Sequence, residues 1–112
     1  MSRVVYRIVV NNPPSDDDLR SYADLGHTVS RPKPELERLM TGISVMGTME
    51  AAIKKAKGRP WLSDAWIAEI VIPNDSALVI EKTTRDPNHY TVWAAVEELR
   101  GLVGRVVRVP KD

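Results

Sequence analysis

Short runs of β-branched and aromatic residues, each ended by a turn sequence, recur along the whole chain. Such runs are typical of β-strands, and the Pro, Gly, Asn and Asp residues between them are typical of turns. A connection as short as 73–76 joins neighbouring antiparallel strands. We therefore predict a mainly antiparallel sheet with strands over Arg3–Val10, Ile43–Met46, Trp66–Ile72, Ala77–Thr83, His89–Trp93 and Leu102–Val109.

Helix signals lie between these strands, mainly in the N-terminal half. Ser15 is a typical N-cap and Asp18 occupies the position that reciprocates the cap, so a helix is predicted from Ser15 to Gly26. Further short helices are expected over residues 34–42, 48–58 and 94–100. The predicted fold class is α+β: a single compact domain over residues 1–112, with a split or strongly bent, mainly antiparallel sheet and three to four short helices.

The composition narrows the classes of function. Of the 112 residues, 43% are hydrophobic and 28% charged, the balance of a globular protein with one modest core. The chain has no cysteine and only two histidines, far apart, so neither disulfides nor a metal site is expected. Lys and Arg total 16 against 15 Asp and Glu, and this net charge of +1 predicts neither a nucleic acid nor a membrane partner. Without a secretory signal pattern or an apolar run of about 20 residues, a cytoplasmic location is expected.

Three charged residues interrupt strand faces that are otherwise apolar. Residues on one face of a strand recur at every second position, and this alternation places Arg7, Glu69 and Glu81 on such faces. An unpaired buried charge is costly, so each must form an ion pair, lie at a sheet edge or line a wet cleft. The planar guanidinium of Arg7 suits a phosphate or carboxylate ligand, and a glutamate nearby would orient a hydroxyl or act as a base.

The segment 88–93 places an imidazole, a phenol, a hydroxyl and an indole within a few residues. His89 is a candidate ligand contact, or alternatively a strand-end residue bonded to backbone. Tyr90 and Trp93 fall on opposite faces of a regular strand, so at least one of them belongs to the core. Ser44 is either a ligand-contacting hydroxyl or a hydroxyl bonded to backbone. The basic residues in 54–59 are interpreted as stabilising the C-terminal end of a helix.

The order of three motifs resembles a group of small, uncharacterised bacterial proteins. The motifs are an opening Val5-Tyr6-Arg7, a central Gly42-Ile43-Ser44-Val45 ahead of an alanine-rich helix, and a late segment 89–93. More distantly, the layout is similar to the ADP-ribosyltransferase fold, in which two small sheets face each other across an NAD cleft.

The resemblance implies roles for particular residues. Arg7 would bind a phosphate of NAD, and Ser44 would support the nicotinamide ribose. A late glutamate, for which Glu81 is the candidate, would orient the ribose and the acceptor as the catalytic residue. His89 or Tyr90 would stack against or hydrogen-bond the base.

Two hypotheses of function follow. The first is a cleft protein that resembles ADP-ribosyltransferases and binds NAD or a related nucleotide. The second is a non-enzymatic protein-interaction module, such as an inhibitor or an antitoxin-like partner. Its binding surface would be an exposed strand edge or the acidic segment 16–18.

Overall fold

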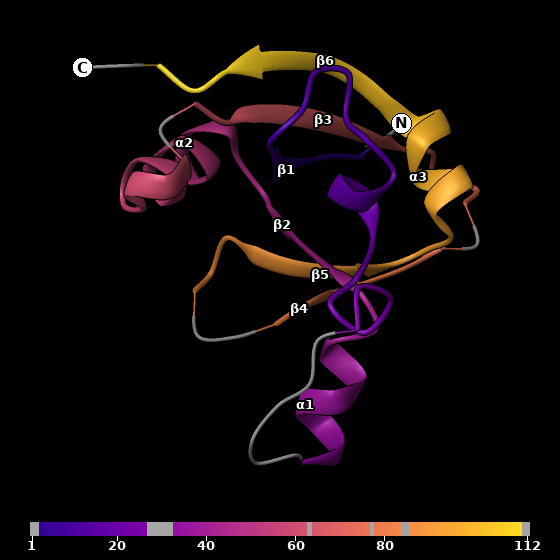
Figure 1. Cartoon of the computed structure of the whole chain (residues 1–112). Coiled ribbons are helices and arrows are strands. Elements are labelled where there is room, and N and C mark those ends of the chain that lie inside the picture. Colours follow the sequence, from indigo (N-terminus) through magenta and orange to yellow (C-terminus); the bar gives the residue numbers. More distant parts are fainter. Residues whose placement is uncertain (1–2, 27–32, 63, 77, 84–85, 111–112) are drawn as a thin grey trace.

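A computed structural model gives the fold and describes residues 3–26, 33–62, 64–76, 78–83 and 86–110 (Figure 1). Within these ranges the strands are β1 (Arg3–Val9), β2 (Ile43–Met46), β3 (Trp66–Ile72), β4 (Val79–Lys82), β5 (His89–Trp93) and β6 (Val103–Arg108). The helices are α1 (Pro34–Leu39), α2 (Met49–Lys57) and α3 (Val96–Leu102), with 3-10 turns η1 (Asp17–Leu19) and η2 (Pro60–Leu62). The order of the strands agrees with the prediction, and the helices expected over 34–42, 48–58 and 94–100 are present, whereas the first predicted helix is not. Ala77, the first residue of one predicted strand, lies outside the described residues.

The six strands form one sheet in the order β4-β5-β2-β1-β3-β6, and every neighbouring pair is antiparallel. The predicted α+β class and antiparallel sheet are confirmed. The expected split or strong bend is corrected, because the sheet is continuous and is neither strongly curled nor closed. The reason is that β2 pairs with β5 along its length and with β1 at Tyr6 and Met46, so it joins the two parts (Figure 1).

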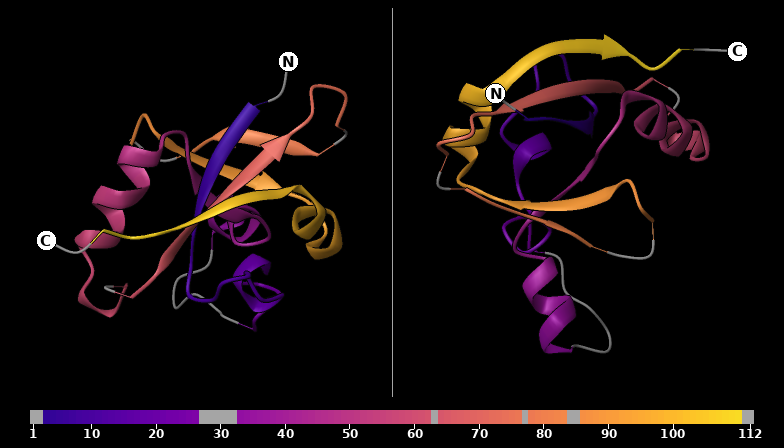
Figure 2. Two further views of the ribbon diagram at one scale, coloured as in Figure 1. Left: turned by 90° about the horizontal axis from the view of Figure 1, so that it is seen from above. Right: turned by 180° about the vertical axis from the view of Figure 1, so that it is seen from behind.

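The core lies on both faces of the sheet. Val5 pairs with Ile70 and Ile8 pairs with Ile67, and because Val5 and Ile8 differ in parity they point to opposite faces. Val5 and Ile70 belong to a cluster with Leu99 of α3, whereas Ile67 and Ile8 belong to a cluster with the alanines of α2. Both views of Figure 2 show α2 and α3 at opposite sides of the strands.

Helix α2 forms as its sequence predicts. The Thr48 hydroxyl accepts a hydrogen bond from the Ala51 N–H at 3.1 Å, and Ala52 and Ala56 are fully buried. The helix ends at Gly58, the predicted C-cap. The helices among the described residues are six, nine and seven residues long, and none is long and apolar enough to cross a membrane.

The first predicted helix is wrong in length. Ser15 and Asp18 do form the reciprocal cap, but only the 3-10 turn η1 follows, and Arg20 is already extended. Asp18 also accepts a hydrogen bond from the Val10 N–H at 3.0 Å and another from the Asn11 amide at 3.0 Å. These contacts hold the turn against the end of β1, and the chain then leaves the helical direction. Gly26 keeps the expected left-handed conformation, with φ +83°.

Helix α1 is short and none of its residues is buried. Leu36 is 41% exposed, and Figure 1 shows α1 projecting away from the sheet. An apolar stripe on a helix normally packs against a core. Here Leu36 and Leu39 instead form part of the wall of a cavity, described below.

Candidate functional site

Arg7 lies where β1 and β2 separate. The two strands share a single register pair, Tyr6 with Met46, and the side chain of Arg7 fills the space beyond it. Its Nε donates to the Asp18 carbonyl at 3.1 Å and its Nη1 donates to the Ser44 carbonyl at 2.8 Å. These two bonds fix the guanidinium between the 11–19 connection and β2.

The charge of Arg7 has no carboxylate partner within the described ranges. Burial lowers the pKa of Arg7, while Tyr22 and Asp18 act in the opposite direction. A guanidinium remains protonated in proteins, so a partly buried positive charge is held here by hydrogen bonds to two backbone carbonyls. Its second terminal nitrogen, Nη2, makes no hydrogen bond with the described residues. Arg7 is therefore a fixed cation with unused donors.

Three neighbouring cavities surround this part of the sheet. The inner cavity, of about 200 Å³, lies between β2, β5 and α1 and is lined by Arg7, Ser44, His89, Thr91, Leu36 and Leu39, among others. The cationic cavity, of about 300 Å³, shares Arg7 and Ser44 with it and adds Tyr6, Lys55, Arg59 and Trp61. The lateral cavity, of about 750 Å³, lies beside α2 and contains Lys55, Arg59 and His89 together with Glu50 and Asp86.

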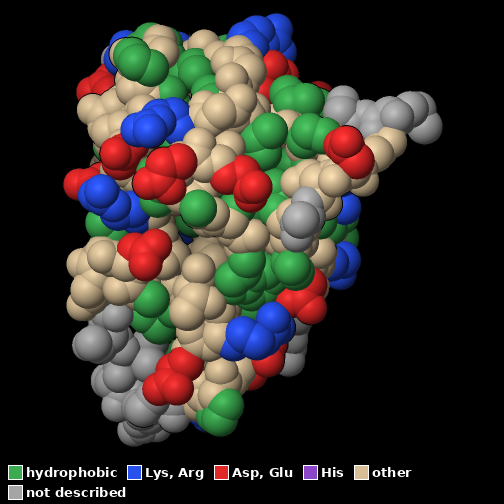
Figure 3. Space-filling view, turned by 90° about the vertical axis from the view of Figure 1, so that its right-hand side faces the viewer, with side chains coloured by type: hydrophobic (Ala, Val, Ile, Leu, Met, Phe, Trp, Pro, Cys, Tyr) green, Lys and Arg blue, Asp and Glu red, His purple; other side chains and the backbone are tan. Residues whose placement is uncertain are grey.

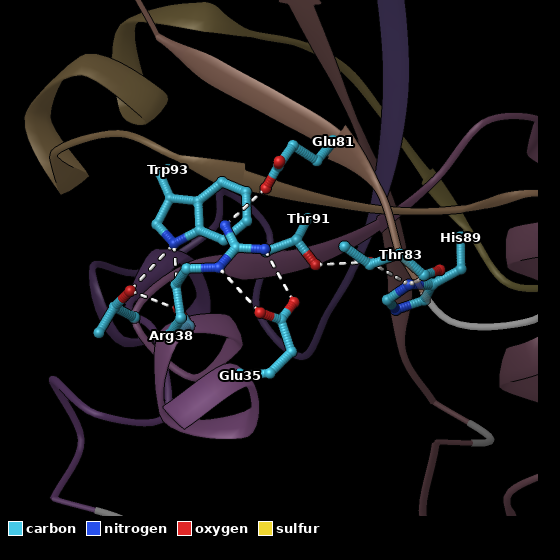
Figure 4. A network of polar contacts seen from close by, with 8 residues as sticks. Glu35, Arg38, Glu81, Thr83, His89, Thr91 and Trp93 are labelled. Atoms are coloured by element: carbon cyan, nitrogen blue, oxygen red, sulfur yellow. Dashed lines mark hydrogen bonds and ion pairs between the residues drawn. The ribbon is translucent and has the colours of Figure 1, made fainter. Parts of the chain in front are cut away.

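A buried polar network forms the floor of the inner cavity (Figure 4). The Thr83 hydroxyl lies 2.7 Å from the Thr91 hydroxyl and 3.0 Å from Nδ1 of His89. Nδ1 also lies 3.2 Å from the Thr83 carbonyl, which can only accept, so this contact places the ring hydrogen on Nδ1 and leaves Nε2 as an acceptor. Burial and the charge of Lys55 lower the pKa of His89, against the opposing effects of the Thr83 carbonyl and Asp86, and this favours the neutral imidazole.

Gly42 makes room for this network. A Cβ at Gly42 would lie 2.5 Å from the Cγ2 of Thr91 and 2.9 Å from the carbonyl oxygen of Val92. Contacts this close involve backbone as well as a side chain, so a larger residue would have to displace β5. The glycine of the predicted Gly42-Ile43-Ser44-Val45 motif is thus required by the close approach of β2 and β5.

Glu81 stands outside the three cavities. It accepts a hydrogen bond from Nη1 of Arg38 at 2.6 Å, and Arg38 also pairs with Glu35 at 2.9 Å (Figure 4). The same guanidinium lies 5.0 Å from the ring of Trp93, whose indole N–H donates to the Thr41 hydroxyl at 2.9 Å. Glu81 shares a sheet face with the inner cavity, since it pairs with Thr91 in register. All of these charged groups are largely exposed.

The predicted site residues are brought together only in part. Arg7, Ser44 and His89 line the inner cavity together. Tyr90 points to the opposite face of β5, where it packs against the cluster around Val5, with the guanidinium carbon of Arg3 4.5 Å from its ring centroid. The other charged strand residue, Glu69, pairs with Arg105 at 3.3 Å near the β6 edge. Of the three charged strand residues, Arg7 lines a cavity, Glu69 forms an ion pair and Glu81 lies on the edge strand β4. These are the three situations that were expected for charges on a strand face.

The sequence interpretation missed Lys55 and Arg59 as cavity residues. They were assigned, with their basic neighbours, to the favourable charge at the end of α2. Of the basic residues in 54–59, Lys55 and Arg59 line both the cationic and the lateral cavity, whereas Lys54 lines the lateral cavity alone. The spacing of four residues between Lys55 and Arg59, which is the spacing of one helix face, was the available signal. Lys54 and Lys57 are exposed.

No group of three or more His, Asp and Glu residues in the described part of the chain is arranged to hold a metal ion. Comparison of the chain with protein-family models, curated proteins and solved structures finds no match. The geometry of the three cavities and the motif resemblance are therefore the observations that bear on the function.

Proposed function

We propose that the protein binds NAD or a related nucleotide at the inner cavity, with Arg7 holding a phosphate. The observation that carries this proposal is the fixed guanidinium of Arg7, which uses two donors on backbone carbonyls and has no carboxylate partner among the described residues. A phosphate oxygen is a natural partner for the remaining donors, because a guanidinium binds phosphate through parallel hydrogen bonds.

The rest of the cavity suits a ligand with both polar and apolar parts. Ser44, Thr91 and His89 supply hydroxyl and imidazole groups on one side, while Leu36 and Leu39 supply apolar surface on the other. Ligand cavities commonly combine apolar walls with a few placed polar groups. In this proposal the ligand lies between β2 and β5 on one side and α1 on the other, with Arg7 of β1 at its phosphate.

Catalysis by Glu81 would require a rearrangement. Its carboxylate is engaged by Arg38 and it lies outside the cavity walls, so it must exchange this partner before it can contact a ribose or an acceptor. Both side chains are exposed and the pair is weak in water, so a ligand can compete with it. The residues present therefore fit the phosphate-binding part of the implied NAD site, and transferase chemistry is the more distant step of the proposal.

The test is thermal unfolding with and without millimolar NAD, ADP-ribose or AMP. A ligand that binds only the folded state raises the unfolding midpoint, with about 2.7 kcal/mol of stabilisation at a hundredfold excess over the dissociation constant. Arg7→Lys and Arg7→Gln should reduce or abolish the shift, and the matched control Arg105→Gln, at the β6 edge, should keep it. A shift that persists in a folded Arg7→Gln variant, or none with any ligand, would refute the proposal.

A second candidate function is protein interaction through the edge of β4. The strand is at one end of the sheet, and Val79 is 52% exposed. An edge strand offers unpaired backbone groups to another chain. The acidic segment is less suited, because Asp18 is buried and the other two aspartates form ion pairs with arginines. Val79→Lys should abolish co-purification of a partner bound in this way; retention of a stable partner by Val79→Lys would exclude the β4 edge.

A further inference from the structure

The cationic cavity gathers three positive side chains and no negative one. Arg7 comes from β1, whereas Lys55 and Arg59 come from the end of α2 and the residue after its C-cap. None of the described residues in its walls is Asp or Glu. On the face that Figure 3 shows, by contrast, acidic and basic side chains are intermingled. The single sign of charge is therefore a local property of this cavity.

Two carboxylates outside the walls of the cationic cavity, those of Asp86 and Asp18, partly offset the charges of Lys55 and Arg7, but neither lines the cavity. Arg59 donates from Nη1 to the Lys55 carbonyl at 3.2 Å, and Arg7 likewise bonds to carbonyls, so neither guanidinium has a carboxylate partner. Burial lowers the pKa of Lys55, the positive charges of Arg59 and Arg7 lower it further, and the charge of Asp86 acts in the opposite direction. Like charges held together cost free energy, and an anion placed among them removes that cost.

An exposed aromatic ring stands at the same cavity. Trp61 lies in η2, directly after the basic end of α2, and is 75% exposed, while its neighbour Leu62 packs against the cluster under α2. Tyr22, on the other side, is 56% exposed. A large exposed ring beside a group of cations is the combination with which proteins bind single-stranded nucleic acids, because bases stack on the ring and phosphates contact the cations.

We propose that the cationic cavity binds a phosphate of a single-stranded nucleic acid, with a base of the same strand stacked on Trp61. The net charge of +1 argues against a general affinity for nucleic acid. The proposed binding depends instead on the local group of cations at this cavity. The lateral cavity shares Lys55 and Arg59 but contains Glu50 and Asp86, so the phosphate is placed on the Arg7 side of these two cations. The cationic and inner cavities share Arg7 and Ser44, so a strand phosphate here and an NAD phosphate in the inner cavity would compete for the same guanidinium.

The experiment is fluorescence anisotropy of labelled single strands, one of DNA and one of RNA, each about ten nucleotides long, which is within the range that one such surface covers. The variants are the double substitution Lys55→Gln with Arg59→Gln, and Trp61→Ala. Lys57→Gln is the control for a charge on the exposed side of α2; it removes one positive charge, whereas the double variant removes two. Circular dichroism verifies that each variant is folded.

The double variant should weaken binding at least tenfold and lower the slope of log affinity against log salt, since each phosphate contact contributes about one unit to that slope. Trp61→Ala should weaken binding at least fivefold, and Trp61→Phe should restore it, because any aromatic ring stacks. Lys57→Gln should change affinity less than twofold. The DNA and RNA arms identify which nucleic acid is preferred.

Three results would overturn the proposal: no binding of either strand at low salt, equal losses in the double variant and Lys57→Gln, or full retention in Trp61→Ala. Displacement of the strand by free AMP at the same nucleotide concentration would also overturn it, because the cavity would then be a mononucleotide site. A protein that binds the strand but shows no thermal shift with NAD keeps this inference and refutes the function proposed for the inner cavity.

Discussion

The sharpest test of the link between fold and site is Asp18→Asn. Asp18 is only 8% exposed, and its carboxylate accepts hydrogen bonds from the Val10 N–H, the Ser15 N–H and the Asn11 amide at 3.0, 2.9 and 3.0 Å. An asparagine keeps one acceptor oxygen, and its NH₂ group would face the donors that Oδ2 now accepts from. The carbonyl of the same residue accepts from Arg7. Loss of this anchor would therefore also loosen the guanidinium.

The magnitude follows from the bonds lost. Hydrogen bonds to a charged group contribute about 1.5–3 kcal/mol each, and part of this is recovered because the Asn11 side chain is exposed and can bind water, so we expect a loss of roughly 2–4 kcal/mol. The assay is urea unfolding at pH 7. Asp17→Asn is the control, because its side chain is 68% exposed and it should lose less than about 0.5 kcal/mol.

The pH dependence gives a second readout. Burial alone would raise the pKa of Asp18, but hydrogen bonds from Val10, Ser15 and Asn11 outweigh it and hold the pKa below its ordinary value. A carboxyl with a lowered folded-state pKa stabilises the fold fully above its unfolded pKa of about 3.9, and this stability is lost as pH falls through the folded-state pKa. Asp18→Asn should remove this contribution to acid unfolding. The reasoning would be refuted if Asp18→Asn had the same free energy of unfolding as Asp17→Asn, or if its stability fell with decreasing pH as steeply as that of the parent protein.

Three further predictions concern the site. Gly42→Ala should cost about 1–3 kcal/mol in urea unfolding, because its Cβ would lie 2.5 Å from a methyl carbon of Thr91; a neutral effect would contradict the required close approach. Glu81→Gln should change stability by less than about 1 kcal/mol, since its ion pair is exposed, and a larger loss would show a structural role. NMR titration should give His89 a pKa below its ordinary value. The neutral form then stabilises the fold fully above the unfolded-state pKa of about 6.5, and this stability is lost as pH falls through the folded-state pKa. Lys55→Gln should raise this pKa, and an unchanged midpoint would contradict the proposed charge contact.

The parts of the fold that were predictable are those set by neighbouring residues. The Thr48 cap, the buried alanines and the glycine end of α2 all lie within one segment, so local signals determine the helix. The first predicted helix fails for the opposite reason. Ser15 and Asp18 form the local cap as expected, but the carboxylate of Asp18 also accepts hydrogen bonds from Val10 and Asn11, which precede the cap. A contact outside the helix decides its length, and no local pattern contains that contact.

The candidate site was predictable where one residue conflicts with its surroundings. Arg7 breaks an apolar strand face, and that conflict singled it out from the sequence; a cleft was one of the three situations expected for it, and the structure places it beside a cavity. Nothing in the sequence marks Lys55 and Arg59 as unusual, because positive charges at the C-terminal end of a helix are favourable whether or not they line a cavity. Their role depends on where β1 passes relative to α2, which only the assembled sheet defines. The ion pair between Glu81 and Arg38 likewise joins residues 43 positions apart.

Arg7 joins the structural and functional arguments in one side chain. Where the pairing of β1 and β2 stops, the carbonyls of Ser44 and Asp18 each accept a hydrogen bond from its guanidinium. The planar fork reaches both at once, whereas the single ammonium of a lysine would not span them in the same way. These bonds fix the charge before any ligand arrives, so binding would not have to order it. If Arg7 were purely structural, a carboxylate of the protein could accept hydrogen bonds from its remaining donors. None of the described residues supplies such a carboxylate, and we therefore assign these donors to an anionic ligand.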